Sequence, residues 1–209
     1  MLTFYHAPQT RSTGVRILLE ELGAPYDMQV LNRNRGEHRQ KDFLAINPLG
    51  KVPAIEHDGA LVTEQVAIFI YLADAFPERG LAPPIGDPLR GPYLRWLAFY
   101  GSSFEPALVD HHLGHSPDPE QPRQVAMSPY GSYDGVVDLL DQQLATGPFL
   151  LGERFTAADV LWGTALGWTL QFKLLPARPA FTAYAGRIGG RAAARRVVDE
   201  DAALAAMHA

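Results

Sequence analysis

The chain has 209 residues, which is long for one small domain and sufficient for two. Its formal net charge of −5 argues against a nucleic-acid partner, which a basic surface would favour. It contains no cysteine, and this excludes disulfides, thiolate metal sites and a protein thiol as nucleophile. We see no signal-peptide pattern and no apolar run near the ~18 residues that span a membrane, so we expect a cytoplasmic protein with no membrane partner.

The first half of the chain predicts strands alternating with helices. Residues 2–5 and 26–31 have strand patterns, and residues 15–22 between them carry one apolar helical face. A helix in this place supplies the crossover that two parallel strands need. Residues 37–46 predict a weaker helix.

A hairpin and an apolar helix come next. Residues 52–56 and 60–62 predict two strands joined by the turn signal Asp58-Gly59. The helix that follows ends near Pro77, and residues 78–92 have the proline and glycine content of a linker.

Beyond the linker, strand patterns are absent from the sequence. We expect helices from Tyr93 onward, over 133–144, near 157–172, over 179–188 and over 191–207. Residues 115–123 predict a polar loop between the first two of these helices. Phe155-Thr156-Ala157-Ala158-Asp159 predicts a capping box at the start of one of them, so we interpret Asp159 as structural.

Pro53 stands where a short apolar strand should begin. Proline cannot donate to a sheet ladder, so it occurs at strand starts, edges or bulges. If the Val52-Pro53 bond is cis, the Val52 amide and carbonyl face outward and can pair with a peptide-like ligand. Glu64 and Gln65, at a helix start, offer an acceptor for an amine and donors for a carboxylate.

The Val-Pro pair, the hairpin and Glu64-Gln65 before an apolar helix resemble the thioredoxin-like half of cytosolic glutathione transferases. The resemblance, with bacterial, theta-like and nu-like features, extends over nearly the whole chain, although Gln65 stands where the family usually has Ser. It implies a thioredoxin-like glutathione-binding domain over 1–80 and an all-helical domain over 88–209 that shapes the second-substrate site. It also implies a homodimer that takes glutathione and a small hydrophobic electrophile and needs no metal.

The activity implied is ionisation of the glutathione thiol, because the thiolate is the nucleophile. A hydroxyl that donates a hydrogen bond to the thiolate stabilises it by roughly 1.5–3 kcal/mol. We expect such a hydroxyl between the first strand and the first helix. Gln9 occupies the place of the hydroxyl in many serine-type members. Thr10 is our first candidate, because some microbial and fungal members place a hydroxyl residue directly before Arg. Ser12 and the strand residue Tyr5 remain alternatives.

Three basic residues complete the candidate glutathione-binding site. Arg11 is placed to steady the thiolate. His38 lies in a Gly-Glu-His run similar to a Gly-Gln-His of theta-type transferases, and it and Lys51 would approach the glycine end of glutathione.

The sequence also contains features of other kinds of protein. His111 and His115 have the spacing of a zinc pair, but no third ligand is suggested, so we expect no metal site. The departures at Gln9 and Gln65 leave open a glutathione-dependent disulfide or peroxide reductase, or a non-enzymatic carrier of hydrophobic ligands.

Overall fold

A computed structural model describes residues 1–208. The chain forms two compact units: Met1–Ala82 together with the segment that starts at Gly190, and Pro83–Gly189. The sequence grouped the segment after Gly190 with the helical half, whereas its contacts lie with the first unit. The division into functional domains over 1–80 and 88–209 stays a prediction.

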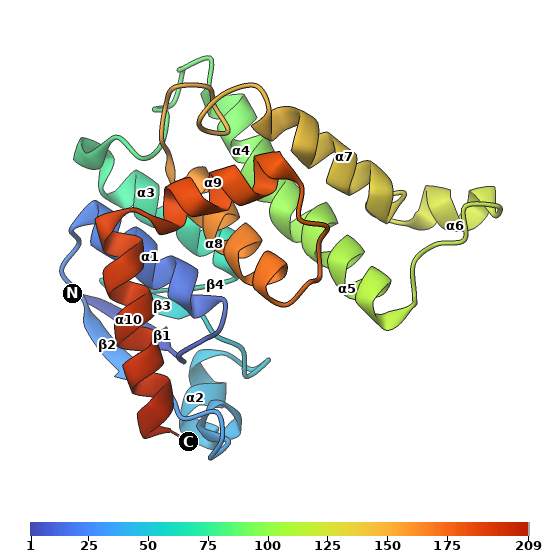
Figure 1. The fold of residues 1–209 in the computed structure, drawn as a ribbon. Coiled ribbons are helices and arrows are strands. Elements are labelled where there is room, and N and C mark those ends of the chain that lie inside the picture. The colour runs from blue at the N-terminus through green and yellow to red at the C-terminus, as the bar shows by residue number, and fades with distance from the viewer. Residues whose placement is uncertain (209) are drawn as a thin grey trace. The chain divides into compact units, whose positions relative to one another are not determined.

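The first unit contains a four-stranded sheet in the order β2-β1-β3-β4, with β1 and β2 parallel and the other neighbours antiparallel. This is the thioredoxin-like arrangement expected. Figure 1 shows its elements: β1 (Leu2–His6), α1 (Ser12–Leu22), β2 (Asp27–Val30), a 3₁₀ turn (Glu37–Arg39), α2 (Lys41–Ile46), β3 (Ala54–His57), β4 (Ala60–Thr63), α3 (Gln65–Ala75), a second 3₁₀ turn (Pro77–Arg79) and α10 (Ala192–Met207).

Two predicted elements differ from the observed ones. The helix expected over 37–46 is interrupted at Gln40, whose extended backbone (φ −79°, ψ 156°) separates the 3₁₀ turn from α2. The strand expected from 52 begins at Ala54, because Pro53 has no amide proton to give to the ladder. The Val52-Pro53 bond is cis, which is the case considered from the sequence.

The second unit is helical throughout its regular elements. Residues 115–123 were expected to form a loop, but Pro122 begins a short helix there, since proline suits a first helical turn. The helices are α4 (Arg90–Phe99), a π-helical segment (Tyr100–Phe104), α5 (Glu105–Leu113), α6 (Pro122–Met127), α7 (Tyr133–Leu144), α8 (Ala157–Gln171) and α9 (Pro179–Gly189). Among residues 1–208, no helix is both long and apolar enough to cross a membrane.

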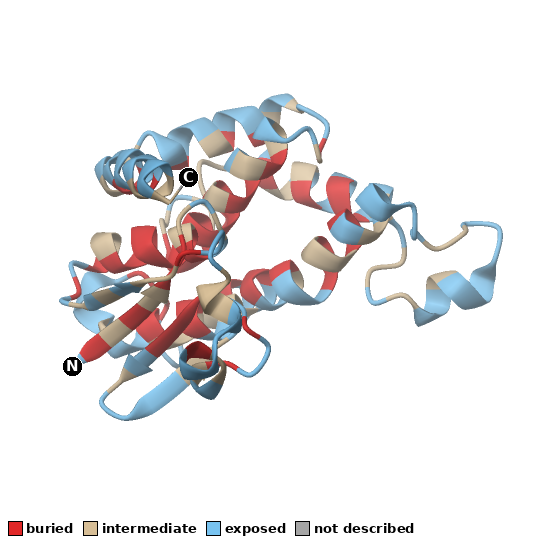
Figure 2. Ribbon diagram, turned by 90° about the horizontal axis from the view of Figure 1, so that it is seen from below, coloured by how far each residue is buried: buried red, intermediate tan, exposed pale blue. Residues whose placement is uncertain are grey.

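The core of the second unit is built on α8, which is buried along most of its length (Figure 2). The Trp162 ring lies 4.8 Å from the Phe104 ring, and its indole N–H donates to the Trp96 carbonyl oxygen at 3.0 Å. At Gly163, an added Cβ would come within 2.4 Å of the Ile188 Cβ on α9. Only glycine therefore allows these two helices to approach so closely.

The predicted capping box at the start of α8 is confirmed. Asp159 accepts from the Thr156 amide (2.8 Å), the Leu150 amide (2.8 Å) and the Tyr184 hydroxyl (2.7 Å). Burial raises the pKa of Asp159, and the hydrogen bonds to its carboxylate act in the opposite direction. The side chain is fully enclosed, so its role is to hold the start of α8.

We predict that Asp159→Ala lowers the free energy of unfolding by about 2–4 kcal/mol, because several buried donors lose their acceptor. The matched control is Ser132→Ala, which removes the exposed cap of α7 that accepts from Gly135 and should cost only about 0.5–2 kcal/mol. Urea titrations of both variants measure the two losses. An equal decrease in unfolding free energy in the two variants would show that the buried acceptor contributes no more to stability than the exposed cap does.

Candidate active site

The sheet register brings three chain segments to one end of the first unit. Ala54 on β3 pairs with Tyr5 on β1 and with Thr63 on β4. The chain leaves β1 and β4 and enters β3 at this level. The residues that follow Tyr5, precede Ala54 and follow Thr63 therefore gather at the same edge, where strand ends of α/β proteins commonly bind ligands.

The amino-terminal ends of α1 and α3 meet at this edge. The Gln65 side-chain amide donates to the Arg11 carbonyl oxygen at 2.9 Å, while the buried Gln65 Oε1 has no partner among residues 1–208. The first amides of a helix lack partners within it and favour an anion. Gln9 and Glu64 flank these ends with φ values of 56° and 66°. Such strained residues are commonly found at functional sites.

Thr10 and Ser12 differ in their access to a ligand. Thr10 is half-buried, and its hydroxyl lies 2.7 Å from both the Ala7 carbonyl oxygen and Ser12 Oγ. Ser12 is fully buried, and its Oγ contacts the Ala7 amide (3.1 Å), the Ala7 carbonyl oxygen (2.9 Å) and His6 Nδ1 (2.9 Å). Of the two hydroxyls, that of Thr10 is the better placed to meet a ligand.

Ser12 and Thr13 are of the residue types that often cap a helix, but neither is the amino-terminal cap of α1. The cap position is Arg11, which makes no side-chain capping bond, and the Ser12 amide donates instead to Thr10 Oγ1 at 3.2 Å. The Thr13 hydroxyl donates to Asp201 on α10 at 2.5 Å. Both residues take part in tertiary contacts rather than in local capping.

Tyr5 lies on the opposite face of the sheet from Ser12. Side chains alternate along a strand, so Tyr5 points away from the face that buries Phe4 and His6. Its ring packs 5.8 Å from that of Phe43 on α2. Burial, followed by the charge of Glu56, raises the pKa of Tyr5. This environment favours the interpretation of Tyr5 as a packing residue.

His38 and Lys51 come together through a close approach of two loops. Gly50 has a φ of 59°, and an added Cβ would lie 2.7 Å from the His38 carbonyl oxygen. Burial lowers the pKa of His38, and the charges of Arg39, Arg33 and Lys51 lower it further. These cations make the loop pair a suitable place for a carboxylate.

Val52 presents its backbone at the same edge. Within residues 1–208, its amide and carbonyl have no place in the sheet ladder and no other backbone partner. The loop before it is held by Asn47, whose side-chain amide donates to the Lys51 carbonyl oxygen at 2.8 Å. Pro53 itself is buried. The Val52 backbone can thus pair with an extended ligand.

A buried network that we did not predict adjoins Ser12. His6 Nε2 lies 3.1 Å from Asp201 Oδ1, and Arg16 donates to the same oxygen at 3.0 Å. Burial alone would raise the pKa of Asp201, but the bonds from His6, Thr13 and Arg16 and the charge of His6 lower it overall. The available signal was the strand alternation, which places His6 on the buried face and therefore requires a polar partner.

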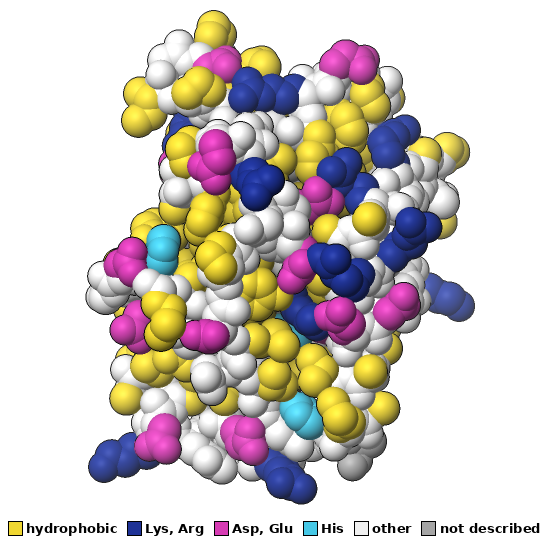
Figure 3. Space-filling view, turned by 90° about the vertical axis from the view of Figure 1, so that its left-hand side faces the viewer, with side chains coloured by type: hydrophobic (Ala, Val, Ile, Leu, Met, Phe, Trp, Pro, Cys, Tyr) yellow, Lys and Arg dark blue, Asp and Glu magenta, His cyan; other side chains and the backbone are white. Residues whose placement is uncertain are grey.

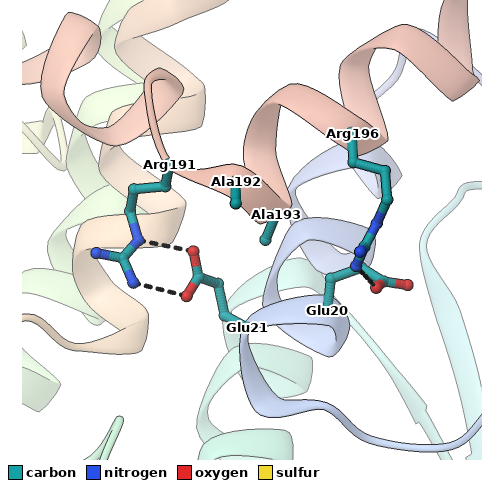
Figure 4. A pocket seen from close by; sticks show the side chains of 6 residues that line it. All are labelled: Glu20, Glu21, Arg191, Ala192, Ala193 and Arg196. Carbon is teal, nitrogen blue, oxygen red and sulfur yellow. Dashed lines mark hydrogen bonds and ion pairs between the residues drawn. The ribbon is translucent and has the colours of Figure 1, made fainter.

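Other polar side chains interact with one another or with aromatic rings. Figure 3 shows acidic and basic side chains interspersed on one face of the molecule. Figure 4 shows a surface pocket between α1 and α10, where Arg191 donates to both carboxylate oxygens of Glu21 at 2.7 Å and Arg196 pairs with Glu20. His111 stacks on Tyr133 at 3.7 Å, and residues 1–208 contain no cluster of three possible metal ligands.

Comparison with known proteins decides the family. The model of the glutathione S-transferase N-terminal domain matches residues 1–74, and that of the C-terminal domain matches residues 130–187. A sphingomonad glutathione S-transferase solved in complex with glutathione is 32% identical, with 96% of this chain and 98% of that chain covered and a TM-score of 0.77. The chain belongs to the glutathione S-transferase family.

Two curated relatives align with this chain over most of their own lengths. Glutathione S-transferase GstA of Escherichia coli O157:H7 is 29% identical over 83% of this chain and 85% of the relative. Disulfide-bond oxidoreductase YfcG of Escherichia coli K12 is 28% identical over 92% of each. The family models, GstA and the sphingomonad transferase support glutathione transferase activity with glutathione as co-substrate, and the reductase alternative has no better support.

We predict that Asp201→Asn removes an acid-dependent part of this transferase's stability. The pKa of Asp201 is lower in the folded state than the ~3.9 of an unfolded chain. Its contribution is therefore present above about pH 4 and lost as the pH falls through the folded-state pKa. The difference in unfolding free energy between wild type and variant should shrink from about pH 6 to about pH 2. A difference that stays constant, measured by urea titration, would contradict the prediction.

Proposed function

We propose that the first unit of this glutathione transferase binds glutathione at the edge described above. The Val52 amide and carbonyl pair with the peptide backbone of glutathione, as a sheet edge pairs with a strand. Glu64 accepts from the ligand amine, and Gln65 and the start of α3 meet the carboxylate beside that amine. Support comes from the register, which brings the ends of β1, β3 and β4 to one level.

The other end of glutathione meets the cationic loops. We assign the glycine carboxylate to His38 and Lys51, since several positive charges surround His38. A carboxylate bound there offsets the repulsion that lowers the pKa of His38. Pro53 shapes the loop that presents Val52, and Arg11 adds positive charge near the ligand sulfur.

Thr10 is the hydroxyl that we propose to stabilise the glutathione thiolate. The observation that carries this assignment is the contrast between a half-buried Thr10 and a fully buried Ser12. A hydroxyl donating to the thiolate contributes roughly 1.5–3 kcal/mol, and a helix start adds about 0.3–1 kcal/mol. Together they are sufficient to lower the thiol pKa by about two units, which requires ~2.7 kcal/mol.

The thiolate attacks an electrophilic carbon of a small apolar substrate and forms a sulfur–carbon bond. Either a leaving group departs with the electron pair of the bond that breaks, or an adjacent π bond opens and its electron pair takes up a proton. The helical domain provides the second-substrate site. The resemblance to cytosolic transferases further supports a cytoplasmic homodimer with a detoxifying role. Light scattering of the intact protein tests the dimer, and a panel of apolar electrophiles tests the substrate class.

Glu64→Gln tests the binding site. It keeps the shape of the side chain but removes the charged acceptor for the ligand amine, so glutathione affinity should fall by about 1.5–3 kcal/mol, or roughly 10- to 150-fold. Calorimetry measures this change. Glu78→Gln, at an exposed position in a 3₁₀ turn, is the matched control and should leave affinity unchanged. Equal affinities for both variants would refute the assignment of Glu64.

Thr10→Val tests the activation of the thiol. It keeps the branched shape and deletes the donor, so the pKa of the bound thiol should rise and conjugation at neutral pH should slow, while glutathione affinity stays nearly intact. The expected rise is about one to two units, measured by the ultraviolet absorbance of the thiolate as pH is varied.

Two further variants locate the hydroxyl if Thr10 is not responsible. Full turnover in Thr10→Val together with loss in Ser12→Ala or Tyr5→Phe would move the role to that residue. Ser12→Ala should also lower stability, because it leaves the buried Ala7 amide and His6 Nδ1 without their partner. Turnover with disulfides or peroxides in place of carbon electrophiles would favour the reductase, and ligand binding without turnover would favour the carrier.

A further inference from the structure

Four side chains form a continuous chain of hydrogen bonds from the candidate site into the interior. Thr10 Oγ1 lies 2.7 Å from Ser12 Oγ, Ser12 Oγ lies 2.9 Å from His6 Nδ1, and His6 Nε2 lies 3.1 Å from Asp201 Oδ1. Only Thr10 is partly exposed, and the other three residues are at most 2% exposed. A chain enclosed in this way leaves few choices for the position of each proton.

The charges at the inner end fix one proton of His6. Asp201 accepts from the Thr13 hydroxyl and from Arg16, whose other terminal nitrogen pairs with the partly exposed Glu200. The lowered pKa of Asp201 keeps it ionised, and a carboxylate only accepts hydrogen bonds. His6 Nε2 therefore carries a proton toward Asp201. Whether Nδ1 also carries one depends on the balance between the attraction of Asp201 and the repulsion of Arg16.

With a neutral His6, the chain of protons points inward. Nδ1 is then an acceptor and takes the proton of the Ser12 hydroxyl. Ser12 Oγ accepts from the Ala7 amide and has room for the proton of Thr10, and the Ala7 carbonyl oxygen offers that proton a second acceptor at 2.7 Å. The ligand sulfur must compete with both for the single proton of Thr10.

With a charged His6, the direction reverses. Nδ1–H donates to Ser12 Oγ, so the Ser12 proton turns to the Ala7 carbonyl oxygen or to Thr10 Oγ1. Thr10 Oγ1 then accepts from the Ser12 hydroxyl as well as from the Ser12 amide at 3.2 Å. Ser12 Oγ no longer competes with the sulfur for the Thr10 proton, and of the two acceptors only the Ala7 carbonyl oxygen still does.

We propose that His6 and Asp201 are positioning residues that act through Ser12 to turn the hydroxyl proton of Thr10 toward the sulfur of bound glutathione. This inference rests on the proposed role of Thr10. In this proposal His6 donates from both ring nitrogens, to Asp201 and to Ser12, so that the buried contacts order the two hydroxyls ahead of substrate ionisation. Neither His6 nor Asp201 touches glutathione.

The test is a double-mutant cycle on the full chain that combines Asp201→Asn with Thr10→Val. The readout is the pKa of the glutathione thiol in the saturated complex. Asp201→Asn keeps the side-chain shape and removes the charge, so it should raise this pKa by about half a unit to one unit, which lowers the thiolate fraction roughly three- to tenfold. In the Thr10→Val background, the same change should leave the thiol pKa where it is.

The matched control is Asp199→Asn, which removes one negative charge from an exposed position of α10 outside this network and should not move the thiol pKa. An equal rise from Asp201→Asn with and without Thr10 would overturn the proposal, because the carboxylate would then act by another route. An unchanged thiol pKa in Asp201→Asn, beside a raised one in Thr10→Val, overturns this inference and leaves the proposed function intact. An unchanged pKa in Thr10→Val defeats the proposed role of Thr10 itself.

A measurement on the wild-type protein keeps the proposal testable if Asp201→Asn does not fold. Nitrogen NMR of protein labelled in histidine, with glutathione bound, reports the protons on each ring, and the His6 signals are assigned by their loss in His6→Gln. We expect both ring nitrogens of His6 to carry protons in the complex. A neutral ring, or an unprotonated Nε2, would overturn the proposal.

Discussion

The contact between His6 and Asp201 is the constraint that holds the first unit together. It joins β1 to α10 across 195 positions of the sequence, and both side chains are almost completely excluded from water. A buried carboxylate is costly unless charged or polar groups surround it. Arg16 and Thr13 on α1 complete that surrounding, so one carboxylate fixes a strand and two helices. Ser12 connects this cluster to the loop that carries Thr10, because its hydroxyl contacts both His6 and Thr10.

The strand and helix order of the first unit could be predicted because it depends on local patterns. Alternation and turn residues identify the strands, and Pro53 identifies the beginning of β3 by the hydrogen bond that it cannot make. The capping box at Thr156 and Asp159 was readable for the same reason, since its partners lie three residues apart. The interruption at Gln40 could not be predicted, because the apolar spacing of residues 37–46 gives no indication of it.

The candidate site was predicted less completely, and the reason is physical. The residues of the glutathione-binding site follow from spacing and family resemblance. The choice between Thr10 and Ser12 depends on which hydroxyl is enclosed. Ser12 contacts the buried His6, and the other ring nitrogen of His6 contacts Asp201, 195 positions further along the chain. Single-sequence patterns carry no signal for such a pairing. The one local indication of a distant partner was His6, a polar residue that strand alternation places on the buried face of β1.

The grouping of α10 with the sheet also has a consequence during synthesis. A ribosome delivers Met1–Ala82 first, but the carboxylate that completes the interior beside His6 emerges only after the whole of the second unit, Pro83–Gly189. Domains generally fold as units in the order in which they leave the ribosome. Here the helical unit is complete in sequence before the sheet unit is. Until Asp201 has been translated, more than a hundred codons later, the Nε2 atom of His6 on the buried face of the sheet lacks its partner.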